Sequence, residues 1–101
     1  MTAAVEIVTY RVEGDQDAYL ALRAAAIAEV KAQHPALQSV PFASRRDDGS
    51  WYDVWIYDSV DAANAANDDT PNLPRFLEFL GVLTDVVIEI TTAPDEARNV
   101  L

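Results

Sequence analysis

The chain has 101 residues, of which 17 are acidic and 7 basic, for a formal net charge of −10, and half of its residues are hydrophobic. This balance predicts one globular domain over residues 1–101. Because a polyanion is repelled by phosphate backbones and anionic lipid surfaces, we expect no nucleic acid and no membrane among its partners. The absence of cysteine excludes disulfides and thiolate chemistry, and the N-terminus does not resemble a secretory leader, so we interpret the protein as cytoplasmic.

The first third of the chain predicts a strand followed by a long helix. Residues 4–12, "AVEIVTYRV", are rich in β-branched and aromatic side chains, and the run ends before Gly14. From Asp15 the pattern becomes helical and continues to about Gln33, with an acidic first turn. Pro35 in the following "HP" ends the helix, so we assign His34 to the helix C-terminus. A histidine cation there interacts favourably with the helix dipole, and we favour this role over a catalytic one.

The middle of the chain predicts a hairpin. The second strand covers 37–46, although Pro41 cannot donate to a ladder and requires an edge position or a bulge. Asp48-Gly49 supplies a tight turn. The third strand is "SWYDVWIYDS" at 50–59.

The last third predicts an interrupted helix and a final strand. Ser59 is the expected N-cap of a helix over 60–67, which "DDTPNLPR" interrupts. The helix reopens near Asn72 and Pro74 and ends at Gly81 in the C′ position. A fourth strand follows at 84–93, and we expect residues 93–101 to form a short, loosely ordered tail.

The resulting order, β-α-β-β-α-β, is that of an α+β ferredoxin-like sandwich: a four-stranded antiparallel sheet with two helices on one face. The first and fourth strands carry apolar residues on both faces. An apolar sheet face without helices would be an aggregation liability, so we expect a second copy of the chain to cover it in a homodimer.

Strict alternation in the third strand places Trp51, Asp53, Trp55 and Tyr57 on one face. The rings could simply fill the core. A carboxylate between two Trp residues must be solvated, paired or perturbed, so we consider two readings of Asp53. It is a base whose pKa is raised by an apolar setting, or it faces water or pairs with Arg11 or Arg45.

The segments "WIYDS" and "AANDDTPN" resemble those of the antibiotic biosynthesis monooxygenase-like (ABM) domains of the dimeric α/β barrel superfamily, and the resemblance covers residues 4–93. In that family the third strand ends with an acidic residue, any residue, Trp, any residue, Asp, and the next helix carries two histidines. Here Trp55 stands at the acidic position, Tyr57 at the Trp position, and Asn67 and Asn72 at the histidine positions. Haem-degrading members use a helical histidine as iron ligand, so the resemblance does not extend to haem degradation.

The resemblance implies a cofactor-independent monooxygenase, or a related isomerase or cyclase, acting on an aromatic or polyketide-like compound in a pocket between the sheet and the second helix. Asp53 would be the base and Tyr57 a second catalytic residue, and the substrate-binding candidates are Trp55, Asn67, Asn72, Arg11 and Phe76. We expect no cofactor and no metal, because one histidine and no cysteine leave too few ligands. The alternative is a non-catalytic, ligand-binding or structural homodimer, and a cavity beside Trp55 would favour ligand binding.

Overall fold

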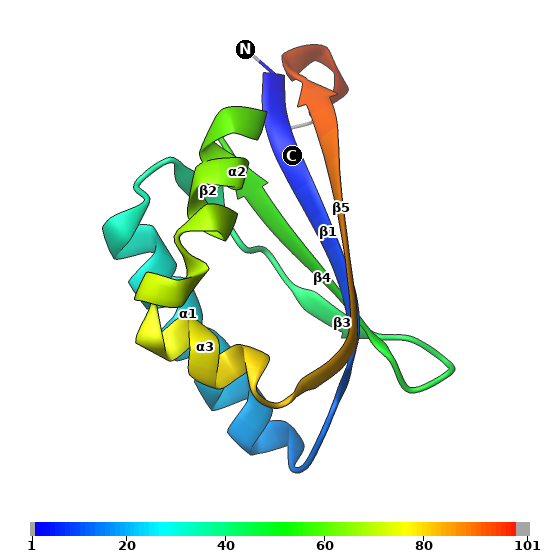
Figure 1. Ribbon diagram of the computed structural model, residues 1–101. Helices are drawn as coiled ribbons and strands as arrows, with labels where there is room; N and C mark the ends of the chain where they lie inside the picture. Colours follow the sequence, from blue (N-terminus) through cyan, green and yellow to red (C-terminus); the bar gives the residue numbers. More distant parts are fainter. Residues whose placement is uncertain (1, 99–101) are drawn as a thin grey trace.

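A computed structural model describes residues 2–98, which form one antiparallel sheet with all of the long helices on one side (Figure 1). The strands follow the order β2-β4-β1-β5, and β3 also pairs with β4. The central pair is therefore β1 and β4, whose inward residues have neighbours on both sides. The strands are β1 Thr2–Val12, β2 Leu37–Ser39, β3 Ala43–Arg45, β4 Trp51–Tyr57 and β5 Leu83–Pro94.

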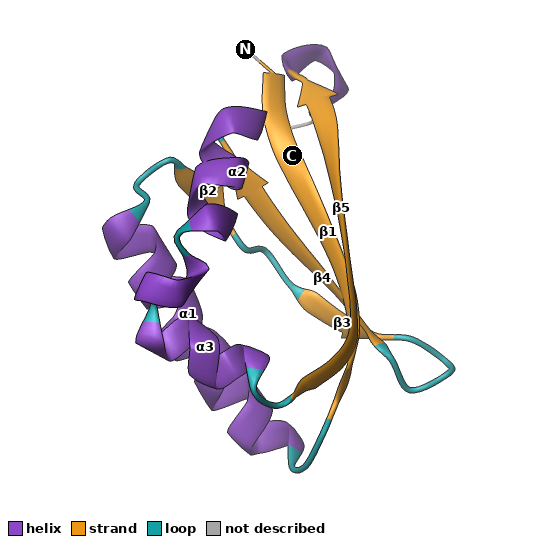
Figure 2. Ribbon diagram, in the orientation of Figure 1, coloured by secondary structure: helices purple, strands orange, loops and turns teal. Residues whose placement is uncertain are grey.

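Three α-helices cover one face of the sheet and leave the other bare (Figure 2). They are α1 Gln16–Gln33, α2 Val60–Asp68 and α3 Pro74–Leu80, with short 3-10 turns η1 Thr70–Asn72 and η2 Asp95–Ala97. The strand order and the one-sided helices confirm the predicted α+β ferredoxin-like fold.

The predicted second strand is two short strands, so the sheet has five strands rather than four. The chain leaves the ladder around Pro41, between β2 and β3, and the register of β2 against β4 also shifts between Leu37 and Ser39. Both segments pair with the same side of β4, at the edge of the sheet. The expected edge position of Pro41 is therefore correct, and its missing N–H explains why one strand became two.

Two details of the predicted helix ends and tail need correction. Gly81 is the C-cap of α3 with φ −63°, so it does not take the left-handed C′ conformation. Gly49 in the hairpin turn has a positive φ of 85°, as expected for a tight turn. The predicted tail is partly ordered: it contains η2, and Arg98 Nη1 donates to Gln38 Oε1 at 3.1 Å. Residues 99–101 of that tail lie outside the described residues.

The core lies between the central strands and the helices. Inward side chains alternate along β1 and β4, as the sequence predicted for β4, and the rings of Tyr10, Tyr19, Trp51 and Phe79 contact one another at centroid distances from 4.9 to 6.1 Å. This aromatic cluster packs α1 and α3 against the central strands β1 and β4.

Side chains cap the first turns of α1 and α2, and the sequence predicted the cap of α2, Ser59. Asp15 accepts from Ala18 N at 3.0 Å and Ser59 Oγ accepts from Ala62 N at 3.1 Å.

We expect Ser59→Ala to lower the free energy of unfolding by about 1 kcal/mol in urea denaturation, because the first turn of α2 loses an acceptor. The control Ser39→Ala, at an exposed position of β2, should change it by less than about 0.5 kcal/mol. Equal effects would contradict a capping role.

Candidate functional site

A cavity of about 200 Å³ lies between the inner face of the sheet and the segment from α2 to α3. Its walls are mostly apolar and aromatic, with a few polar groups from β1, β4 and α2. Two of its residues on the edge strand β5, Val86 and Ile88, are 40% and 50% exposed, so the cavity opens at that edge. The lining residues are Glu6, Val8, Tyr10, Asp53, Trp55, Tyr57, Asn67, Thr70, Phe76, Phe79, Leu80, Leu83, Val86 and Ile88.

Most of the site residues predicted from the sequence line this cavity: Asp53, Trp55, Tyr57, Asn67 and Phe76. The alternation of β4 brings the first three to one face, as expected. The edge of the Trp55 ring meets Phe76 of α3 at a centroid distance of 5.9 Å and an interplanar angle of 80°. The cavity thus has an aromatic corner built from a strand and a helix.

Arg11 and Asn72 do not belong to the group that lines the cavity. Arg11 is exposed near the end of β1, and its Nη1 donates to the carbonyl of Asp48 in the hairpin at 3.1 Å. Asn72 lies in η1 and donates to Asp69 Oδ1 at 2.9 Å. The correspondence of Asn72 with a family histidine therefore did not predict its position, because the 3-10 turn directs its amide to the loop.

His34 is the C-cap of α1, as predicted, and is away from the cavity. Its Nε2 lies 2.8 Å from Asp69 Oδ2, which connects α1 to the turn after α2. Hydrogen bonds from Asn72 and His34 hold the pKa of Asp69 below its usual value.

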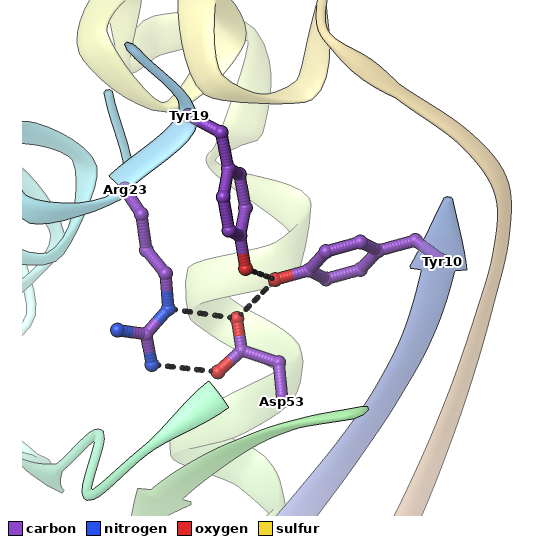
Figure 3. A network of polar contacts seen from close by, with 4 residues as sticks. All are labelled: Tyr10, Tyr19, Arg23 and Asp53. Atoms are coloured by element: carbon purple, nitrogen blue, oxygen red, sulfur yellow. Dashed lines mark hydrogen bonds and ion pairs between the residues drawn. The ribbon is translucent and has the colours of Figure 1, made fainter. Parts of the chain in front are cut away.

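Asp53 is fully buried and belongs to a four-residue polar network (Figure 3). Arg23 of α1 binds it through two hydrogen bonds, from Nη2 to Oδ1 at 2.8 Å and from Nε to Oδ2 at 3.0 Å. Tyr10 of β1 donates to the same Oδ2 at 2.7 Å, and the Tyr10 and Tyr19 hydroxyls are 2.6 Å apart. Because the Tyr10 hydroxyl donates its hydrogen bond to Asp53, the Tyr19 hydroxyl is the donor in the bond between the two tyrosines.

This network corrects the expected partner of Asp53. Neither Arg11 nor Arg45 pairs with it; the guanidinium of Arg45 lies 5.9 Å from the centroid of the Trp51 ring. A two-pronged bond to arginine and a third donor engage both oxygens of the carboxylate. The geometry therefore argues against Asp53 as the base and favours a role in holding α1 and β1 together.

Glu6 of β1 is the polar cavity residue that the sequence analysis missed. Its side chain is 5% exposed, and its Oε2 accepts from Asn67 Nδ2 at 3.0 Å. No residue among 2–98 donates a hydrogen bond to its Oε1. Burial raises the pKa of Glu6, the bond from Asn67 partly lowers it, and the charge of Asp53 raises it further.

A signal for Glu6 was present in the sequence. It has the same parity as Val8 and Tyr10 in the first strand, so one alternation rule places all three on the inner face. In the sheet Glu6 lies directly opposite Trp55. A charged residue at an inward position of a central strand is expensive to bury, and this makes it a candidate site residue.

The Tyr57 hydroxyl also has no hydrogen-bond partner among the described residues. Burial and the charge of Glu6 raise its pKa well above the usual range of a phenol. Tyr57, which lines the cavity, is therefore neutral at physiological pH, and its hydroxyl can donate a hydrogen bond.

Stability should report the environment of Glu6. The pKa of Glu6 is higher in the folded chain than in the unfolded chain, so the unfolded chain loses this proton first as pH rises above about 4.5. The free energy of unfolding therefore falls with rising pH until Glu6 also ionises in the folded chain. We expect Glu6→Gln to be more stable than the native chain at neutral pH, with a difference that vanishes at acidic pH where both forms of Glu6 are protonated. Urea denaturation of both chains from acidic to neutral pH measures this. A constant difference across pH would contradict it.

Within residues 2–98, no three His, Asp or Glu side chains are grouped so as to hold a metal ion. None of the helices described there has the length and apolar character needed to cross a membrane.

Comparison with known proteins finds similarity at the level of structure. No family model and no curated protein sequence matches the chain. SnoaB, a cofactor-independent oxygenase from Streptomyces nogalater, is 18% identical and superposes over 100% of this chain and 98% of its own, with a TM-score of 0.69. A protein from Caulobacter crescentus assigned to the antibiotic biosynthesis monooxygenases is 20% identical over 92% of this chain and 91% of its own, with a TM-score of 0.71.

A NIPSNAP-family protein of unknown function from Agrobacterium tumefaciens is 21% identical over 90% of this chain and 87% of its own, with a TM-score of 0.63. Identities in this range show a shared fold and no more. The chain has the ABM-like fold that the sequence resemblance implied.

Proposed function

We propose that the protein is a small-molecule enzyme similar to the cofactor-independent ABM-type monooxygenases, acting on an aromatic or polyketide-like compound in the cavity between the sheet and α2. The observation that carries the proposal is the cavity itself. It has an aromatic corner at Trp55 and Phe76, and the polar residues Glu6, Tyr57 and Asn67 also line it. A core packed solid would offer no such combination.

The size of the cavity suits a flat ring system. In another protein an engineered apolar cavity of about 150 Å³ binds benzene. A cavity of about 200 Å³ that opens at β5 accommodates one or two fused rings, with larger substituents extending past Val86 and Ile88. Trp55 and Phe76 would contact the ring faces and edges.

The proposed reaction uses only the substrate and dioxygen. A protein group removes a proton from a phenol, the electron pair spreads to a ring carbon, and that carbon reacts with O₂. One oxygen atom remains as a quinone carbonyl, the other leaves as water with the two hydrogens removed from the substrate, and the substrate carbon is oxidised while O₂ is reduced. Tyr57 and Asn67 would donate hydrogen bonds to the developing oxyanion, in the manner of an oxyanion hole.

An oxygen-uptake assay tests this function. Anthrone and naphthol-type compounds are incubated with the protein in the presence of a chelator, and quinone absorbance and O₂ consumption are followed together. Equal amounts of quinone formed and O₂ consumed, above the rate without protein, would support the proposal. Ligand binding without O₂ consumption would favour the alternative, a non-catalytic ligand-binding homodimer.

We also propose that the protein is a homodimer joined through the bare face of the sheet. Outward residues of the central strands are apolar: Val5 and Ile7 of β1 lie opposite Ile56 and Val54 of β4. On β5, Val87 is 61% exposed. The helices cover only the other face, so a second copy is the simplest cover for this surface (Figure 2).

Light scattering at micromolar concentration should give about twice the 11.1 kDa mass of one chain. Val87→Lys should shift the mass toward the monomer, because a charge would be buried between the sheets. Leu77→Lys, which is 43% exposed on α3, is the control and should remain dimeric. A native chain that scatters as a monomer would refute the dimer.

A further inference from the structure

We propose that Glu6, positioned by Asn67, is the group that accepts the substrate proton in the cavity. This inference rests on the proposed function and deepens it by assigning the proton acceptor to β1 instead of to Asp53 on β4. It also implies a rule for ligands: the site takes a neutral ring compound with a hydroxyl group and rejects the same ring system carrying a carboxylate.

The two cavity carboxylates differ in their free acceptor capacity. Both oxygens of Asp53 are occupied by Arg23 and Tyr10. Glu6 has one oxygen, Oε2, fixed by Asn67 and the other, Oε1, without a donor among residues 2–98. Asp53 thus accepts three hydrogen bonds and Glu6 one, so a ligand hydroxyl in the cavity would find more free acceptor capacity at Glu6.

The surroundings of Glu6 suit a proton acceptor. The titratable groups that line the cavity are Glu6 and Tyr10 of β1 and Asp53 and Tyr57 of β4. The residues that α2, η1, α3 and β5 contribute to the lining carry no charge, and Arg23 of α1 is bound to Asp53. Because it is buried and no lining residue that the structure describes is a cation, the Glu6 carboxylate is more basic than a solvated one.

Asn67 is a positioning residue in this arrangement. Its Nδ2 holds Glu6 Oε2 at 3.0 Å across the cavity wall between α2 and β1. The bond fixes the carboxylate plane and lowers the pKa of Glu6 against the effect of burial. Without it, Glu6 would be free to rotate and would ionise only at higher pH.

The proton step balances within the ligand and Glu6. The hydroxyl O–H bond of the ligand breaks, the proton bonds to Glu6 Oε1, and the electron pair remains on the ligand oxygen. The result is a neutral carboxylic acid beside a ligand anion, so the number of negative charges in the cavity does not change. A ligand that arrives as an anion would instead add a charge next to Glu6 and Asp53, and it would be repelled.

Three probes of nearly equal shape test the inference: 2-naphthol, 2-naphthoate and naphthalene. Binding to the native chain, Glu6→Gln and Asn67→Ala is measured by fluorescence or NMR titration at mildly alkaline pH. Because a hydrogen bond to a charged group is stronger than one to a neutral amide, Glu6→Gln should weaken 2-naphthol binding at least about tenfold. Naphthalene should bind both chains equally, and 2-naphthoate should bind the native chain more weakly than Glu6→Gln.

The pH profile separates a chemical role from a structural one. For the native chain, 2-naphthol binding should strengthen as pH rises through the ionisation of Glu6, and Glu6→Gln should abolish this dependence. In Asn67→Ala the midpoint of the profile should move to higher pH, a shift that simple loss of packing would not produce.

The outcomes distinguish this inference from the proposed function. Loss of 2-naphthol binding in Glu6→Gln with naphthalene binding intact supports the inference. Equal binding of 2-naphthol by the native chain and Glu6→Gln, or of 2-naphthoate and 2-naphthol by the native chain, overturns it and leaves the cavity as a ligand site. If no probe binds the native chain, the proposed function fails and the assignment of Glu6 fails with it.

Discussion

Asp53→Asn should lower the free energy of unfolding by about 3–5 kcal/mol, which is the usual cost of removing one partner of a buried ion pair. The substitution leaves the shape nearly unchanged but removes the negative charge that Arg23 binds through two hydrogen bonds. The Arg23 side chain is only 13% exposed, so water cannot replace the lost partner. One carboxylate oxygen would become an amide NH2, a donor that faces the donors of Arg23 or Tyr10 (Figure 3).

Urea denaturation of matched variants measures this effect. Arg75→Ala removes an ion pair with Glu78 in which both side chains are more than half exposed, and it should cost less than about 1 kcal/mol. The double substitution Asp53→Leu with Arg23→Met should recover much of the loss, because it removes both charges together. A cost for Asp53→Asn no greater than that for Arg75→Ala would show that the network does not stabilise the fold.

Val86→Trp should reduce ligand binding at least about tenfold, for 2-naphthol and naphthalene alike. Val86 lines the cavity and is 40% exposed on β5, so a larger ring at this position would fill the opening without disturbing the core. Aromatic side chains are favoured in strands, so the fold should tolerate the change.

Leu77→Trp is the matched control, because Leu77 is exposed on α3 to a similar extent and does not line the cavity. It should bind both probes as the native chain does. The pattern differs from that of Glu6→Gln, which should affect only the hydroxylated probe. Unchanged binding in Val86→Trp would place the ligand outside this cavity.

Much of the candidate site was predictable because strand alternation is a local rule. Knowing that 51–57 is a strand is enough to place Asp53, Trp55 and Tyr57 on one face, and the structure has them there. The same rule applied to the first strand would have found Glu6. Arg11 does not line the cavity because its side chain binds the hairpin at Asp48, a contact that strand alternation does not predict. Asn72 does not line it because it lies in a 3-10 turn, where it binds Asp69.

The electrostatic roles were not predictable from the chain alone. Arg23 is 30 residues from Asp53 and lies on a helix whose rotation about its axis depends on packing. The sequence offered Arg11 and Arg45 as partners because they lie on strands near the third strand. The correct partner comes from α1 because the aromatic cluster of Tyr10, Tyr19 and Trp51 holds that helix face against the sheet.

The sequence by itself determined the β-α-β-β-α-β arrangement, the Ser59 N-cap, and the aromatic, acidic inner face "WYDVWIY", since period, capping residues and breakers act within a few residues of one another. Only the tertiary structure decided which carboxylate pairs with a cation, Asp53, and which has an oxygen that accepts no hydrogen bond within residues 2–98, Glu6. That difference depends on burial and on partners distant in the sequence. Asp53 binds Arg23 and Tyr10, whereas Glu6, opposite Trp55, has Asn67 as its one hydrogen-bond donor among residues 2–98.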